Sequence, residues 1–168
     1  MKSEAAYRKG DKQTAYNAYV DGIRLHFDML INTYSVNIPP ANLITPAIRD
    51  AYLANTTVVP AAFTDITMAK IMLQKYIALW GHGVLETWVD MRRFHYTDTD
   101  PMGGTGIVYT NFTPPSGTSL FTPDNGGKLV YRVRPRFNSE YVWNVNELAR
   151  IGANQLDYHS KQLWFSEP

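Results

Sequence analysis

Apolar side chains recur every three or four residues from Ile66 to Met91, and this periodicity limits the possible folds more than any other feature of the chain. The repeat consists of Ile66, Ala69, Leu73, Ile77, Trp80, Val84, Trp88 and Met91. Such spacing is typical of an amphipathic α-helix with one apolar face. Trp80, Trp88 and Tyr76 follow the same helical spacing, so we expect them to lie in the core.

Local signals set the ends of this long helix. Thr64 or Asp65 can cap its first turn, and the helix is predicted to continue to Arg93. Gly81 and Gly83 lie inside it and predict a kink at that point.

A second helix is predicted over residues 12–34, which carry their own periodic apolar face. Ala15, Ala18 and Gly22 form a stripe of small side chains along it. Small residues allow a neighbouring helix to approach closely, so the stripe predicts a partner helix.

The segment ahead of that helix has two interpretations. Residues 3–8 lead into Lys9-Gly10-Asp11, which has the spacing of the turn and second helix of a tetratricopeptide hairpin. In that interpretation part of the hairpin lies ahead of Met1. In the other, residues 3–8 are a short helix that ends at a glycine.

The remainder of the chain is less regular. The Thr-Pro pair at 45–46 predicts the start of a short helix that ends at Asn55. Residues 97–127 are rich in proline, glycine and small polar residues and predict a long loop. Alternation of apolar and polar residues over 129–133 predicts a strand, and 144–151 is predicted to be a short helix.

These elements together predict a mostly α-helical fold with tetratricopeptide-like hairpins, long irregular loops and little strand. We expect one domain over residues 1–168, helical over 2–96, with the loop over 97–127 and a strand and helix cap over 128–168.

Composition excludes several functional classes. The chain of 168 residues has 16 basic and 15 acidic residues without a block of one sign, so it shows no footprint for nucleic acid. Because it has no cysteine, disulfides, thiolate metal sites and cysteine nucleophiles are excluded. No secretory signal pattern and no apolar run long enough for a membrane span is present.

Residues with catalytic potential are sparse. Glu86 and Asp90 lie four apart on one predicted helix face, as a glycosidase carboxylate pair could, but the nearby Arg93 favours ion pairing. None of the histidines has the spacing of a metal motif, and no phosphate loop or serine elbow occurs. We therefore expect no catalytic residue, no metal site and no cofactor.

Aromatic side chains are the remaining resource for ligand binding. Tyr109, Phe112 and Phe121 lie in the polar loop, where an exposed ring could stack on the apolar face of a sugar. They are the candidate ligand-binding residues. The alternative is that these rings anchor the long loop to the body of the protein.

Several strings resemble a known family. The strings are Gln74-Lys75-Tyr76, Ala78-Leu79-Trp80, Glu86-x-Trp88, Arg92-Arg93, the segment Ser3 to Asp11 followed by Ala15, Tyr19 and Gly22-Ile23, then Arg134-Pro135-Arg136 with Glu140 and Asn144, and the Trp164-Phe165 tail. In this order they resemble the SusD/RagB family of nutrient-binding outer-membrane lipoproteins. Phe137-Asn138 departs from the family pattern, which has a second proline there.

This resemblance implies a non-catalytic protein that binds a glycan or another nutrient at the extracellular face of the outer membrane. The family delivers its ligand to a TonB-dependent, SusC-like transporter and is anchored by a lipidated N-terminal cysteine. The chain would then be the C-terminal part of such a protein, and the N-terminal part of the same protein would be a further partner. No binding residue carries over by motif.

Two alternatives remain open. One is a helical-repeat scaffold for protein partners, with the proline-rich loop as the docking element. A weaker one is glycoside hydrolysis by Glu86 and Asp90. Exposed rings beside hydrogen-bonding side chains would favour a glycan, whereas a contiguous apolar patch would favour a protein.

Overall fold

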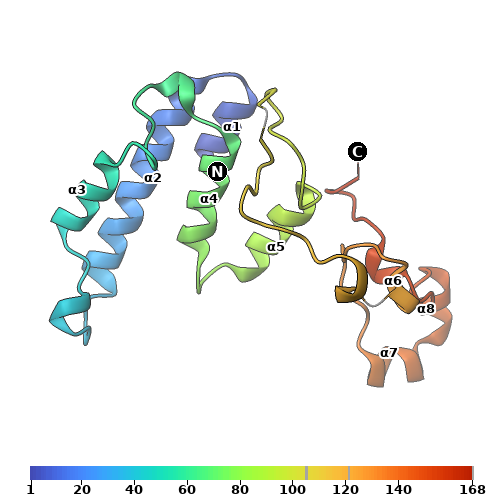
Figure 1. Ribbon diagram of the computed structural model, residues 1–168. Coiled ribbons are helices and arrows are strands. Elements are labelled where there is room, and N and C mark those ends of the chain that lie inside the picture. Colours follow the sequence, from blue (N-terminus) through green and yellow to red (C-terminus); the bar gives the residue numbers. More distant parts are fainter. Residues whose placement is uncertain (105, 121, 168) are drawn as a thin grey trace. The chain divides into compact units, whose positions relative to one another are not determined.

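The computed structural model describes residues 1–104, 106–120 and 122–167. The regular secondary structure of these residues is helical (Figure 1) and comprises eight α-helices and four short 3-10 helices. The described part contains no strand and one isolated antiparallel bridge, between Thr99 and Ile107. The prediction of a mostly α-helical fold is confirmed.

The chain divides into two compact units. Unit 1 comprises Met1–Trp88 and Thr97–Thr110, and unit 2 comprises Val89–Tyr96 and Asn111–Pro168. The single domain over residues 1–168 stays a prediction.

Unit 1 begins with a helical hairpin. Helix α1 (Lys2–Arg8) and helix α2 (Lys12–Thr33) pack side by side, as Figure 1 shows in blue. The Asp11 side chain caps α2 by accepting a hydrogen bond from the Thr14 backbone N–H. Ser3 Oγ donates to the Ala15 carbonyl at 2.7 Å and ties the two helices together. The predicted helices over 3–8 and 12–34 therefore form within a residue or two of their expected bounds.

Helix α3 (Pro46–Ala54) also begins and ends as predicted. The Thr45 side chain accepts a hydrogen bond from the Ile48 N–H, and Asn55 is the C-cap. The ring of Tyr52 contacts Phe27 of α2, with centroids 5.1 Å apart. Short 3-10 turns at Pro40–Asn42 and Phe63–Asp65 flank this helix in the chain.

The prediction of one long helix that ends at Arg93 is wrong in two respects. It consists of two helices, α4 (Met68–Leu79) and α5 (Val84–Arg93), and Thr67, not Thr64 or Asp65, caps α4. Gly81 has φ +77°, a left-handed conformation that ends a helix instead of bending it. A Cβ at Gly83 would lie 2.6 Å from Leu79 Cδ2, so a side chain there would require the Leu79 side chain to move.

The core of unit 1 lies between α1, α2 and α4. Its buried side chains include Tyr7, Ala15, Tyr19, Ile23, Ile66, Met68, Ile71 and Met72. Two tyrosine hydroxyls at its edge donate to backbone carbonyls, Tyr16 to Pro60 and Tyr19 to Val58. Burial raises the Tyr19 pKa.

Unit 2 has shorter elements. They are α6 (Thr122–Asn125), α7 (Phe137–Trp143), α8 (Val145–Arg150) and 3-10 turns at Gly117–Ser119 and Tyr158–Ser160. Leu148, Ala153 and Tyr158 form a small buried cluster with Tyr141 packed against it. The predicted helix over 144–151 is present as α8, whereas α7 was not predicted.

The predicted strand over 129–133 is wrong. This segment has no regular secondary structure, and the N–H groups of Tyr131 and Arg132 both donate to one carbonyl, that of His159. A β-strand pairs with its neighbour through a ladder of successive backbone hydrogen bonds. Two N–H groups that share one carbonyl acceptor do not form such a ladder.

Candidate functional site

The candidate ring residues of the loop have different surroundings. Phe112 is half-buried in unit 2 and stacks on Tyr96, with ring centroids 6.1 Å apart and planes at 29°. Tyr109 is half-buried in unit 1. Phe121 lies outside the described residues. For Phe112 this packing is the arrangement expected of a ring that holds the loop.

A buried carboxylate fixes the first part of the loop within unit 1. Asp100 is 6% exposed, and its Oδ2 accepts from the Tyr7 hydroxyl and from the Met68 N–H, each at 2.9 Å. Its Oδ1 accepts from the Met102 N–H at 3.0 Å. Burial, followed by the hydrogen bond to Asp100, raises the Tyr7 pKa to about 12. The Asp100 carboxylate thus joins the loop to α1 and α4.

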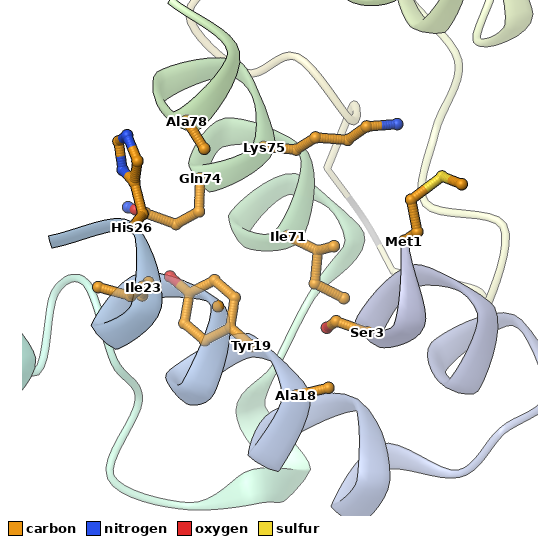
Figure 2. A pocket seen from close by; sticks show the side chains of 11 residues that line it. Met1, Ser3, Ala18, Tyr19, Ile23, His26, Ile71, Gln74, Lys75 and Ala78 are labelled. Carbon is orange, nitrogen blue, oxygen red and sulfur yellow. The ribbon is translucent and has the colours of Figure 1, made fainter. Parts of the chain in front are cut away.

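A groove of about 180 Å³ lies between α2 and α4 of unit 1. Figure 2 shows Tyr19 and Ile23 from α2 and Ile71 from α4 around its apolar part. Two of its polar side chains are engaged within the protein: Gln74 Nε2 donates to the Tyr52 hydroxyl at 2.8 Å, and Lys75 Nζ lies 4.0 Å from Glu4 Oε2. The groove is smaller than most ligand pockets, which are about 300 Å³ or larger.

His26 is a titratable side chain that lines the groove. It is half-buried, and burial, with a smaller effect from the charge on His82, lowers its pKa. The neutral imidazole is therefore favoured in the folded protein.

An apolar stripe runs along the outer side of α4. Leu73, Tyr76, Ile77 and Trp80 are 46%, 40%, 40% and 73% exposed, and the Tyr76 and Trp80 rings meet edge to face at 6.2 Å. The prediction that Tyr76 and Trp80 lie in the core is wrong, because α4 buries Met68, Ile71 and Met72 instead. Trp88 is half-buried.

The candidate acid and base residues differ in environment. Asp90 is 5% exposed, and Arg93 donates to it at 2.9 Å, so the predicted ion pair of this residue is confirmed. Glu86 is exposed. Within residues 1–104, 106–120 and 122–167, no group of three or more histidine, aspartate or glutamate side chains could hold a metal ion.

In unit 2, α7 displays rings that the sequence did not indicate as candidates. Phe137 is 73% exposed and Trp143 is 85% exposed, and their sequence neighbours Asn138 and Asn144 are also exposed. A signal was available, because Glu140 and Asn144 belong to the family-like string that follows Arg134. Pro135, however, breaks any helical pattern ahead of the segment, so local sequence does not mark α7 as a helix.

Within the described residues, none of the helices combines the length and the apolar character needed to cross a membrane. Comparisons of the chain with protein-family models, with curated proteins and with solved structures find no match.

Proposed function

We propose that this chain binds a glycan or another nutrient without catalysis, as part of a SusD-like protein at the outer-membrane surface that supplies a TonB-dependent transporter. In this proposal a lipid anchor and further helical hairpins lie ahead of Met1 in the parent protein. The ligand class rests on one observation, the exposure of Phe137 and Trp143 on α7, with the exposed Asn144 next to Trp143 in the chain. Aromatic faces flanked by amides match the apolar faces and hydroxyl edges of a sugar.

The residues of α5 that resemble the family stabilise the structure and do not form a reaction centre. In α5, Arg92 is 6% exposed, donates to the Tyr131 carbonyl at 2.7 Å and lies over the Phe165 ring at 5.1 Å. Its neighbour Arg93 is paired with Asp90. Because Asp90 is buried and paired, Glu86 and Asp90 do not form an open carboxylate pair that could flank a glycosidic bond.

Affinity electrophoresis tests this function. The purified chain is run in native gels that contain soluble amylopectin, xyloglucan, galactomannan or arabinoxylan, with serum albumin as the non-binding control. At least one polysaccharide should retard the chain, and incubation should release no reducing ends. The same mobility in all gels would contradict glycan binding. Release of reducing ends that Glu86→Gln abolishes would contradict the non-catalytic role.

A protein-interaction scaffold is the second candidate, and the exposed stripe on α4 favours it. Leu73, Tyr76, Ile77 and Trp80 form a contiguous apolar surface on one helix face. A helix that lies along such a surface would contact it at i, i+3, i+4 and i+7. Failure of all four polysaccharides to retard the chain would leave this candidate as the better one.

A further inference from the structure

Helix α7 places two exposed rings on either side of a polar pair. At 100° per residue, Phe137 and Trp143 lie about 60° to the two sides of Glu140, and one is about 4.5 Å before it and the other about 4.5 Å after it along the axis. Asn144, which caps the helix, lies about 40° from Glu140 around the axis, between Glu140 and Phe137. The sequence of groups across the face is therefore ring, polar pair, ring.

The Phe137 ring packs on a second ring that is held in place by a hydrogen bond. Phe137 stacks on Tyr141 with centroids 5.4 Å apart and planes at 27°. The Tyr141 hydroxyl donates to the Ala153 carbonyl at 2.7 Å, which holds the lower ring in place. Phe137 is nevertheless 73% exposed, so its outer face is presented to solvent in a defined orientation.

The polar pair is already oriented. Asn144 Nδ2 donates to Glu140 Oε2 at 2.7 Å, which aligns the amide with the carboxylate. The amide oxygen and the carboxylate oxygens are hydrogen-bond acceptors, as required to bind neighbouring hydroxyl groups. Arg136 is exposed one turn earlier on the same face, so the face carries one charge of each sign. Such a face suits a neutral ligand better than an anionic one.

We propose that this face of α7, formed by Phe137, Glu140, Trp143 and Asn144, is a binding site for neutral glycans. The two rings stack on pyranose faces, and the Glu140–Asn144 pair accepts hydrogen bonds from hydroxyl groups between them. This inference rests on the proposed function and adds the site and the charge class of the ligand.

The test uses the whole chain and the same four neutral polysaccharides in affinity electrophoresis. Trp143→Ala and Phe137→Ala should each weaken retardation by the bound polysaccharide about tenfold, because each removes a stacking surface. Trp143→Phe keeps a ring and should retain most of the retardation. Trp164→Ala is the matched control, since Trp164 is in the same unit, is 84% exposed and lies outside α7. Circular dichroism checks that each variant remains folded.

The outcomes separate the two proposals. If the unmodified chain is retarded but Trp143→Ala and Phe137→Ala bind as it does, the α7 site is wrong and glycan binding stands. Loss of retardation in Trp164→Ala with full binding by Trp143→Ala also overturns the site. If no polysaccharide retards the unmodified chain, both proposals fail together.

Discussion

Unit 1 and unit 2 are each stabilised internally by a different kind of interaction. In unit 1, long helices bury apolar side chains against each other, and Ile66, Met68 and Met72 are almost completely inaccessible. Unit 2 has a small apolar cluster and relies on arginines that donate to backbone carbonyls: Arg92 to Tyr131, Arg132 to Lys161 and Gln162, and Arg134 to Gln155 and Leu156. Long helices satisfy their own backbone groups, whereas irregular chain needs donors from side chains.

The arginines of unit 2 also replace part of an apolar core. The guanidinium of Arg132 lies 4.9 Å from the centre of the Tyr158 ring, and that of Arg134 lies 6.0 Å from the centre of Tyr141. A planar cation can stack on a ring with its face and donate hydrogen bonds with its edge. One side chain thus orders both an aromatic residue and a loop, which suits a region with few regular elements.

Two isoleucines of α4 in unit 1 allow a buried position to be compared with an exposed one. Ile71 is 4% exposed and Ile77 is 40% exposed on the same helix, so they form a matched pair. Ile71→Ala should lower the free energy of unfolding by about 2–5 kcal/mol, and Ile77→Ala by less than about 1 kcal/mol. Urea unfolding followed by circular dichroism measures both. Equal losses would mean that the outer stripe of α4 is also covered in solution.

This pair of isoleucines also shows the limit of the sequence. Periodicity predicts that α4 is a helix, but the helix has two apolar faces. The buried face carries Met68, Ile71 and Met72, and the exposed face carries Leu73, Tyr76, Ile77 and Trp80. The apolar periodicity of a single helix does not show which of its two apolar faces packs against the other helices. That choice depends on contacts with α1 and α2, which are tertiary.

Helix ends were predictable where a local signal determines them. Thr45 and Asn55 bound α3 as expected because a cap needs only its own turn. The break after α4 was predicted as a kink, since the sequence shows two glycines but not the positive φ that Gly81 adopts.

The candidate site could not be predicted to the same extent. The exposed rings of α7 follow Arg134-Pro135-Arg136, where no periodic pattern marks a helix. Phe112 was predicted as a ligand-binding or anchoring ring, and its stacking on Tyr96 depends on residues 16 positions apart in the chain (112 − 96). Contacts of this range are set by the fold and not by local sequence.

A second prediction tests the role of arginine in unit 2. Arg92→Met keeps an apolar side chain near Phe165 but removes the donor to the Tyr131 carbonyl, so it should cost about 1–3 kcal/mol. Arg150→Met is the matched control. Arg150 pairs with Glu147 at 2.6 Å, but the two side chains are 69% and 53% exposed, and such pairs contribute less than about 1 kcal/mol.

Hydrogen exchange with mass spectrometry locates the effect of Arg92→Met. Faster exchange should appear in peptides from residues 122–167, with smaller changes in peptides from α1 and α2. If the peptides of both units exchange faster to the same degree, the units unfold together and the contrast between them is one of composition, not of independent stability.

The smallest expected effect concerns pH and His26 in unit 1. Burial, and next the charge on His82, lowers the pKa of His26 in the folded protein below its ordinary value of 6.5. The unfolded chain therefore binds a proton more readily, and the His26 contribution to stability is present above pH 6.5 and is lost as pH falls through the folded pKa. His26→Gln should reduce the decline in the urea midpoint between pH 7.5 and pH 5, by less than about 1 kcal/mol in free energy. His82→Gln removes only the smaller cause and should reduce the decline less. If His26→Gln leaves the full decline in place, His26 does not cause it, and the groove has no part in the acid response.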